Sequence, residues 1–280
     1  MTASFSVLLS IYYKEDPTHF DEALTSIWDH QILKPNEIVL VKDGPLTPEL
    51  DDVIKHWKQK LGDIFIVSAL EKNEGTGRAK NHGLQLCNYE YIAIMDTDDI
   101  SVSNRFQMQI EYLEKHPNIV VLGGQLQEFV GSLDNIISEK NVPLSHNDIT
   151  SFSKNRSPFN HPTSIYKRKE ITEIGGYKHH LFMEDYNLWI RVLSKGYQTA
   201  NLPDILLYQR ISNGMHGRRR GWQYIKSEWQ MFKLKCSLKY QNRFNAFLLF
   251  LLKSSIRILP TSLLQKIYNT FLRKKIDSSN

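Results

Sequence analysis

Hydrophobic and polar positions alternate in blocks over the first hundred residues, and these blocks predict a repeated order of strand and helix. Short apolar runs predict four buried strands, at Phe5–Tyr12, Glu37–Val41, Ile64–Val67 and Tyr91–Met95. Amphipathic stretches between them predict three helices, at Asp16–His30, Pro48–Leu61 and Gly77–Leu86. This order is typical of an α/β fold with a mostly parallel sheet and helices on both faces, which binds ligands at the carboxyl ends of its strands.

A polar cluster follows each of these predicted strands. In chain order the clusters are Ser10–Tyr12, Lys42–Pro45, Glu71–Gly75 and Asp96–Asp98. Because the carboxyl ends of parallel strands meet at one edge of the sheet, we expect all four clusters to face a single crevice. Asp43 would accept a hydrogen bond from a nucleotide base there, or it would simply begin the turn that contains Gly44 and Pro45.

Three carboxylates, Asp96, Asp98 and Asp99, come directly after the last of these strands. Negative charges this close together raise one another's pKa, so their spacing indicates a divalent cation or a nucleotide hydroxyl as a partner. The alternative is that these acids cap the next helix. Ser101 or Ser103 would fill that role more simply, which favours the functional interpretation of the acids.

A glycine-containing segment, Asn73–Gly83, predicts a phosphate-binding loop at the start of a helix. Glycine allows the backbone to approach a ligand closely, free N–H groups at a helix start favour anions, and Arg78 and Lys80 add positive charge to the first turn. The alternative is a flexible loop with solvated cations. Because the segment follows the third predicted strand and not the first, a Rossmann dehydrogenase is disfavoured.

The second half of the chain adds a different chemistry. It predicts a strand over Asn160–Tyr166, a tight turn at Ile174–Tyr177, and a helix from Glu184 to about Lys195. Glu184 and its neighbour Asp185 would stabilise the helix start through the macrodipole. In a cleft that faces a metal-bound diphosphate, such a pair would equally accept a proton from a hydroxyl group. We expect His161 to be a packed or acceptor-site histidine and not a metal ligand.

Composition limits the class of protein. The chain has 280 residues, of which 41% are hydrophobic, enough for one large domain or for one domain with an appendage. Its two cysteines, Cys87 and Cys236, lie far apart, so neither a disulfide framework nor a thiolate metal site is indicated and a reducing compartment is favoured. We expect no signal peptide, and no apolar run reaches the length of about 18 residues that spans a bilayer.

Positive charge is concentrated near the C-terminus. Residues 218–275 hold 14 Lys and Arg against one acid, a local balance of +13 in a chain whose formal net charge is +5. Aromatic residues interleave with these cations, a pattern that suits an anionic lipid or nucleic-acid surface. The apolar run Phe247–Leu252 and the stripe Leu263–Phe271 predict helices that lie at a membrane interface. The alternative is a C-terminal helix that packs on the protein's own domain, which would explain the apolar stripe but not the positive charge. His216 is a candidate metal or diphosphate contact, or a surface-loop histidine.

Several of these segments agree in order and spacing with a known family over roughly residues 4–210. They are Ser6–Tyr13, Val41–Pro45, Asn73–Gly83, Met95–Asp99, Gly175–Tyr177 and Glu184–Trp189. Together they resemble family 2 glycosyltransferases, and within that family the bacterial enzymes of O-antigen and exopolysaccharide assembly, such as the amylovoran-type glycosyltransferases. The resemblance implies a GT-A fold. Lys42 stands where many relatives have an acid, and the chain lacks the Gln-x-x-Arg-Trp string of processive synthases, so we expect a single-addition transferase.

The resemblance also implies roles for individual residues. The nucleotide-sugar contacts would be Ser10, Tyr12, Asp43 (to the uracil), Arg78, Asn81 and Asp96. A Mn²⁺ or Mg²⁺ ion would be held by Asp98 and Asp96, with His216 as a further candidate ligand. Asp185, with Glu184 beside it, would be the base that deprotonates the acceptor hydroxyl, which then attacks the anomeric carbon with inversion.

The function that follows is transfer of a hexose, glucose or galactose, from a UDP-sugar to a lipid-linked acceptor such as GlcNAc-diphospho-undecaprenol, through a β linkage that the resemblance suggests is β-1,3. We expect residues 1–215 to form the GT-A domain, with a donor half at about 1–124 and an acceptor half at about 125–215. Residues 216–280 would bind an anionic membrane surface peripherally, at the cytoplasmic face of the bacterial inner membrane.

Two other classes remain as alternatives. A nucleotidyltransferase acting on sugar phosphates would also use a metal-bound carboxylate pair, but a Gly-rich activation loop after the first strand is missing. A nucleic-acid-binding module would use the basic tail, but the acidic main body argues against nucleic acid as a partner.

Overall fold

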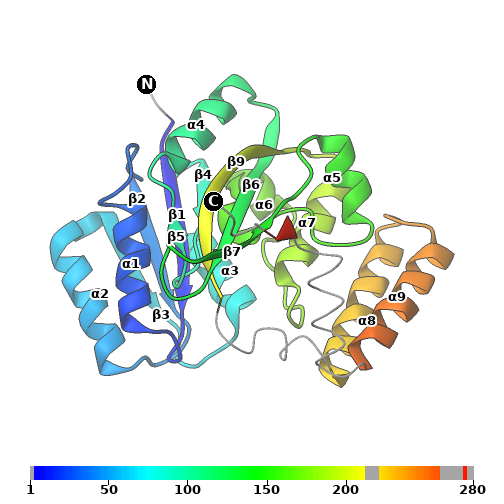
Figure 1. Cartoon of the computed structure of the whole chain (residues 1–280), viewed down its shortest axis with the longest axis horizontal. Helices are drawn as coiled ribbons and strands as arrows, with labels where there is room; N and C mark the ends of the chain where they lie inside the picture. Colours follow the sequence, from blue (N-terminus) through cyan, green and yellow to red (C-terminus); the bar gives the residue numbers. More distant parts are fainter. Residues whose placement is uncertain (1–2, 212–220, 259–273, 276–280) are drawn as a thin grey trace.

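A mixed β-sheet runs through the part of the chain that this computed structural model describes, residues 3–211, 221–258 and 274–275 (Figure 1). The strand order is β10-β7-β6-β8-β4-β1-β2-β3, and β9 pairs with β6 and β5 off this path. The strands are β1 Phe5–Ile11, β2 Glu37–Lys42, β3 Phe65–Ala69, β4 Tyr91–Ile94, β5 Ile100–Ser101, β6 Ile119–Phe129, β7 Ile136–Lys140, β8 Ile165–Lys167, β9 Gln198–Arg210 and β10 Lys274–Lys275. As the sequence predicted, β3, β2, β1 and β4 are mutually parallel, whereas β8 runs antiparallel to both β4 and β6.

Two of the helices begin at a capping residue that is followed by a proline. The helices are α1 Pro17–Ile27, α2 Pro48–Leu61, α3 Thr76–Leu86, α4 Arg105–Lys115, α5 His146–Ser153, α6 Arg168–Glu173, α7 Glu184–Ser194, α8 Trp222–Ser237 and α9 Arg243–Ile258. The side chains of Asp16 and Thr47 accept backbone N–H groups from the first turns of α1 and α2, and a proline follows each cap. Both features are typical of helix starts because they leave fewer N–H groups without partners.

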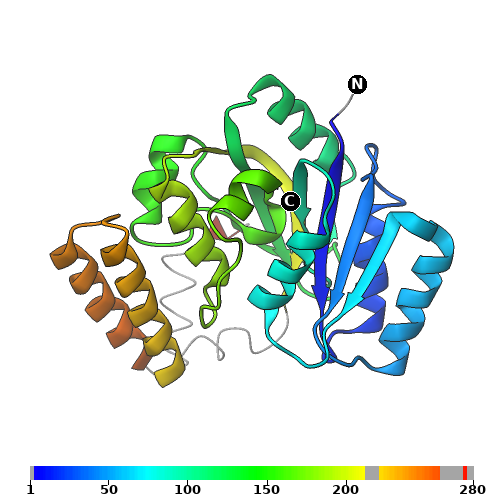
Figure 2. The same ribbon diagram turned by 180° about the vertical axis from the view of Figure 1, so that it is seen from behind.

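Helices lie on both faces of the sheet, as the views from the two sides show (Figure 2). Buried apolar residues form a cluster on each face. Val7 of β1 belongs to a cluster with Phe20 of α1 and Trp57 of α2, whereas the next residue, Leu8, belongs to a cluster with Leu84 of α3. Successive strand residues point to opposite faces, so burial on both faces explains why these strands are continuous apolar runs. Because β1, β2 and β4 are parallel, their carboxyl ends lie at the same side of the sheet.

Helices α8 and α9 pack against each other at the far end of the molecule from α2 (Figure 1). We call this pair the C-terminal hairpin, residues 222–258. Tyr224 and Met231 of α8 pack against Ile190 of α7. The ammonium group of Lys235 donates a hydrogen bond of 2.8 Å to the carbonyl oxygen of Lys154, at the end of α5. None of the helices in the described ranges is both long and apolar enough to cross a membrane.

The structure differs from the sequence analysis in local places. The strand expected over Asn160–Tyr166 is a 3₁₀ turn at His161–Thr163 followed by β8, because a proline at 162 has no N–H group for a sheet hydrogen bond. Ser101 lies in β5, and no side chain caps α4, so neither Ser101 nor Ser103 has the capping role that we weighed.

Other expectations concern the C-terminal region. The helix predicted to carry the stripe Leu263–Phe271 would continue through Lys274 and Lys275, but these two residues form a strand that pairs antiparallel with β7. His216 and the stripe Leu263–Phe271 lie outside the described residues. Both cysteines are free, as expected, and Cys87 is buried.

Candidate active site

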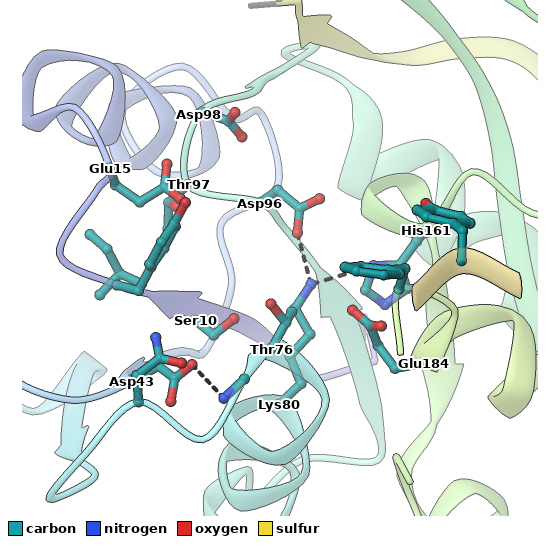
Figure 3. Close-up of a pocket in the computed structure, with 16 residues that line it drawn as sticks. Ser10, Glu15, Asp43, Thr76, Lys80, Asp96, Thr97, Asp98, His161 and Glu184 are labelled. Atoms are coloured by element: carbon teal, nitrogen blue, oxygen red, sulfur yellow. Dashed lines mark hydrogen bonds and ion pairs between the residues drawn. The ribbon is translucent and has the colours of Figure 1, made fainter. Parts of the chain in front are cut away.

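A pocket of about 600 Å³ opens at the carboxyl ends of β1, β2 and β4, where the sequence predicted a crevice (Figure 3). Its walls also include the starts of α3 and α7 and one residue of α8. Six of the predicted site residues line it: Ser10, Tyr12, Asp43, Asp96, Asp98 and Glu184. In Figure 3, Asp43 and Glu184 lie at opposite sides of the pocket, with Lys80 and Asp96 between them.

Asp43 fixes the loop that precedes α3. Its Oδ1 accepts the backbone N–H of Glu74 at 2.7 Å, and its Oδ2 accepts that of Gly75 at 3.0 Å. Gly44, which follows, has a φ of +88°, and a Cβ there would lie 2.6 Å from the backbone nitrogen of Asn73. A glycine is therefore required for the turn to approach this loop so closely.

Lys80 occupies the middle of the pocket wall, although only 1% of its side chain is exposed. Its Nζ donates a hydrogen bond of 2.7 Å to Oδ1 of Asp96. Burial by itself would raise the pKa of Asp96, but the positive charge of Lys80 outweighs this effect and lowers it. Asp96 is therefore held in its ionised form.

His161 lies on the other side of the same ammonium group. Its Nδ1 is 3.4 Å from the Nζ of Lys80, and its Nε2 is 3.0 Å from the Oη of Tyr177. Burial, reinforced by the charge of Lys80, lowers the pKa of His161 to about 3, so the imidazole is neutral. Because an ammonium group can only donate, Nδ1 accepts and the proton lies on Nε2, which donates to Tyr177. Two side chains thus hold the imidazole of His161, which also lines the pocket.

Asp98 and Asp99 differ in their surroundings. Burial and the nearby charge of Asp96 raise the pKa of Asp98 to about 6, and its carboxylate has no ion-pair partner within the described ranges. Asp99 is 1% exposed and lies behind the pocket wall, where its Oδ1 accepts the backbone N–H of Arg210 at 3.0 Å. Burial and the charge of Asp98 raise the pKa of Asp99 well above its usual value.

These carboxylates fit a divalent cation that is shared with a ligand. No group of three or more His, Cys, Asp and Glu side chains in the described part of the chain could hold a metal ion by itself. Asp96 and Asp98 supply two carboxylates to the pocket, and Mg²⁺ is commonly bound by one or two carboxylates together with phosphate oxygens.

Glu184 and Asp185 begin α7 at the opposite side of the pocket. Burial and the adjacent charge of Asp185 raise the pKa of Glu184 to about 7, and Glu184 lines the pocket. Burial also raises the pKa of Asp185, which is not among the lining residues. A Cβ at Gly77 would lie 3.1 Å from the Cβ of Glu184, so this glycine allows the starts of α3 and α7 to lie close together.

Two predicted residues of α3 lie outside the pocket. The side chain of Arg78 is 59% exposed and forms an ion pair of 3.4 Å with Glu74. The Oδ1 of Asn81 is buried and packs against Gly176, where a Cβ would lie 2.1 Å away. The pocket is instead lined by Thr76 and Lys80, which are four residues apart and therefore share a face of the helix. The sequence does not show which face of α3 meets the pocket, so it identified Lys80 only as a positive charge near the helix start.

Comparison with known proteins agrees with this geometry. The family model described as glycosyl transferase family 2 matches residues 6–175. A Haemophilus influenzae protein described as an uncharacterized glycosyltransferase is 44% identical and covers 96% of this chain and 99% of its own. The amylovoran biosynthesis glycosyltransferase AmsE of Erwinia amylovora is 42% identical, over 94% and 97% of the two chains. An Escherichia coli UDP-Gal:alpha-D-GlcNAc-diphosphoundecaprenol beta-1,3-galactosyltransferase is 35% identical, over 98% of each chain.

Solved structures share the fold at low sequence identity. Residues 1–349 of Staphylococcus aureus TarS in complex with UDP-GlcNAc align with a TM-score of 0.67 and 18% identity, over 95% of this chain and 73% of that one. The chain spans 43% of a longer TarS structure. The mannosyltransferase PcManGT of Pyrobaculum calidifontis, in complex with GDP-Man and Mn²⁺, aligns with a TM-score of 0.62 and 14% identity, over 96% and 80% of the two chains. The fold is of the GT-A type, as the sequence resemblance implied.

Proposed function

We propose that this chain, which belongs to glycosyl transferase family 2, transfers glucose or galactose from a UDP-sugar to a lipid-linked sugar acceptor. The proposed acceptor is a molecule such as GlcNAc-diphospho-undecaprenol. The proposed bond is a β linkage, foremost β-1,3. The printed activity of the Escherichia coli relative at 35% identity supports this choice of donor, acceptor and linkage. The amylovoran relative supports a role in O-antigen or exopolysaccharide assembly.

One observation carries the proposal: a single pocket contains an acidic pair, Asp96 and Asp98, on one wall and Glu184 on another (Figure 3). Sugar transfer from a nucleotide needs neutralisation of a departing diphosphate and a base for the acceptor hydroxyl within one cleft. The arrangement supplies groups for both tasks.

The donor end of the site is assigned to the strand ends and the loop before α3. We propose that Ser10 and Tyr12 contact the nucleotide, and that free lone pairs of the Asp43 carboxylate accept the N–H of uracil. Lys80 lies closer to the pocket than Arg78 or Asn81, so direct contact to the diphosphate is assigned to Lys80. Arg78 and Asn81 keep a supporting role in shaping this loop and helix. The TarS complex with UDP-GlcNAc supports a nucleotide-sugar in this fold.

Asp98, with Asp96 beside it, would hold a Mn²⁺ or Mg²⁺ ion. The ion would neutralise charge on the leaving diphosphate. The Mn²⁺ in the PcManGT complex supports this cofactor class. His216 remains a proposed further ligand, although it lies outside the described residues.

The carboxylate pair at the start of α7 is assigned to the acceptor. In this proposal the hydroxyl proton passes to the Glu184–Asp185 pair, and the hydroxyl oxygen attacks the anomeric carbon from the face opposite the diphosphate. The bond between that carbon and the β-phosphate oxygen breaks, and UDP leaves with the electron pair. Attack from the opposite face inverts the anomeric configuration, so an α-linked UDP-hexose gives a β-linked product.

The C-terminal hairpin supports a membrane-linked acceptor. Large apolar side chains that are exposed on it are Trp222, Trp229, Leu238, Phe244, Phe247, Leu248, Leu251 and Leu252. Those of α9 recur at intervals of three and four residues, the spacing of one helix face. Exposed cations accompany them at Lys226, Lys233, Lys239 and Arg243. Apolar and basic groups on one surface favour binding to an anionic bilayer.

We propose that the protein binds peripherally to the cytoplasmic face of the bacterial inner membrane. We also retain the division into a GT-A domain, residues 1–215, and a membrane-associating segment, residues 216–280. The two halves of the GT-A domain, about 1–124 and 125–215, would serve donor and acceptor respectively.

Binding of UDP-, GDP- and dTDP-linked hexoses tests the donor assignment. Calorimetry with Mn²⁺ present should detect binding of UDP-glucose or UDP-galactose. The GDP- and dTDP-linked hexoses should bind at least tenfold more weakly. Equal binding of all three nucleotides, or no binding of any UDP-hexose, would contradict it.

A further inference from the structure

The loop that precedes α7 holds an aromatic side chain in an unusual backbone conformation. Phe182 has a φ of +59°, one of two positive values among the non-glycine residues of the described ranges. Left-handed backbone is strained for a bulky side chain and is retained at positions where the surroundings enforce it. Despite being apolar, Phe182 is 49% exposed.

Helix α8 holds the two residues that precede Phe182. The backbone N–H of Leu181 donates to the Oε1 of Gln230 at 3.3 Å, and the carbonyl of Leu181 accepts the hydroxyl of Ser227. The preceding residue, His180, bonds through Nε2 to the carbonyl oxygen of Ser227 at 3.0 Å. Three hydrogen bonds at two consecutive residues, His180 and Leu181, therefore hold the loop against α8.

Helix α8 also provides a ring on which Phe182 rests. The rings of Phe182 and Tyr224 are parallel within 7°, with centroids 4.6 Å apart. The Arg257 guanidinium lies 4.6 Å from the centre of the Tyr224 ring and bonds to Glu228 at 3.0 Å. Tyr224 is only 8% exposed, so it supports Phe182 from within the hairpin.

Both rings line the pocket on the Glu184 side. Phe182 is separated from Glu184 by one residue, whereas the Asp43 end of the pocket lies across from Glu184 (Figure 3). An exposed aromatic face beside carboxylates suits a sugar ring. Its C–H groups carry partial positive charge and pack on the negative face of the aromatic ring, while its hydroxyls reach the carboxylates.

We propose that Phe182, supported by Tyr224, is the surface on which the pyranose ring of the acceptor stacks, next to the proposed base. This inference rests on the proposed function, and it makes the C-terminal hairpin one wall of the acceptor subsite. Contact of the hairpin with a membrane would then be coupled directly to the position of the acceptor.

Steady-state kinetics of full-length Phe182 variants test the proposal, with a short soluble GlcNAc-diphosphate-lipid analogue as the varied acceptor. Phe182→Ala should raise the acceptor KM about 10-fold, because a sugar–ring stack is lost, and should leave the donor KM and acceptor-free hydrolysis of the UDP-sugar within about twofold. Phe182→Trp, which keeps an aromatic face, should stay within about twofold of the wild type. Ile32→Ala removes an exposed apolar side chain remote from the pocket and is the control.

A Phe182→Gly variant separates loss of the ring from loss of the fold. Glycine tolerates the left-handed backbone, so this variant should have a higher Tm than Phe182→Ala while showing the same rise in acceptor KM. An unchanged acceptor KM in both variants would overturn the proposal, as would a rise confined to the donor KM, which would place the nucleotide base on Phe182. Absence of transfer by the wild type would instead overturn the proposed function.

Discussion

The Nζ of Lys80 lies 2.7 Å from the Oδ1 of Asp96, although the Lys80 side chain is only 1% exposed. A lysine is rarely buried unless it is paired. The pair fixes a positive charge beneath the proposed diphosphate site and keeps Asp96 ionised.

Replacement of Lys80 by methionine should remove this charge while keeping a similar shape. We expect the free energy of unfolding to fall by roughly 1.5–3 kcal/mol, the range for a hydrogen bond to a charged group, and kcat/KM for the donor to fall about 10- to 100-fold. Chemical denaturation and donor kinetics measure the two effects. Lys72→Met, at an exposed position on the loop before α3, is the matched control and should change neither. Wild-type donor kinetics in Lys80→Met would remove the lysine from the site.

The metal assignment predicts a selective loss in Asp98→Ala. This carboxylate has no ion-pair partner within the described residues, so the fold should keep its Tm within a few degrees. Metal-dependent turnover should fall by at least about 100-fold, because the leaving diphosphate loses its neutralising ion. Mn²⁺ titration of both proteins gives the readout, and EDTA should abolish wild-type turnover. Full wild-type activity in EDTA would exclude the metal.

Substitutions of Glu184 and Asp185 should show whether this pair acts in the chemical step or in donor binding. In Asp185→Asn the amide keeps the shape of the side chain but cannot accept a proton, so we expect kcat to fall about 100-fold or more at unchanged UDP-sugar affinity. Glu184→Gln is the companion variant. If both variants kept the wild-type kcat, or if each lost only donor affinity, the pair would not be the base.

The pH profile follows from the same pair. Because burial and Asp185 raise the pKa of Glu184 to about 7, the Glu184 carboxyl group keeps its proton below that pH and can accept a proton above it. Turnover should therefore rise about tenfold per pH unit up to about pH 7 and then level off. Glu184→Gln should eliminate or displace this limb. A wild-type profile that is flat between about pH 5.5 and 8 would contradict the assignment.

The membrane assignment is best tested by substitutions on the C-terminal hairpin. A truncation after Tyr240 would delete α9, and the buried Glu228 of α8 would lose its ion-pair partners. Glu228 is 2% exposed and is paired with Lys253 and Arg257. The double change Lys226→Glu and Lys233→Glu reverses two exposed charges on α8. We expect it to weaken sedimentation with anionic vesicles by about 10-fold or more.

Salt provides a second reading of the same assay. About 1 M NaCl should release much of the wild-type protein, because the screening length falls to about 3 Å. The control changes Lys55→Glu and Lys72→Glu, at exposed positions on α2 and the loop before α3. Equal weakening in this control would mean that the hairpin is not the binding surface.

The sequence predicted the parts of the fold that are determined locally. The start and end of α2 agree with the prediction at Pro48–Leu61, because Thr47 caps the helix and Pro48 begins it. The strand ends and their clusters likewise converge on one pocket, since parallel strands share the direction in which they end.

Features that depend on tertiary packing were not predictable. The sequence analysis assigned a nucleotide-sugar contact on this helix to Arg78. In the structure, the face of α3 that lines the pocket carries Lys80, and the side chain of Arg78 is exposed. The pairing of Phe182 with Tyr224 joins residues from separate elements, and no local pattern indicates it. The strand formed by Lys274–Lys275 depends on β7, more than a hundred residues away in the chain.

The central claim is inverting transfer of a hexose to a lipid-linked sugar. The most direct measurement incubates the purified protein with UDP-galactose or UDP-glucose, Mn²⁺ and GlcNAc-diphospho-undecaprenol in vesicles, and determines product mass and linkage by mass spectrometry and NMR. We predict one added hexose with a β configuration and release of UDP. An α-linked product, or no product from either donor while the protein remains folded, would contradict the account.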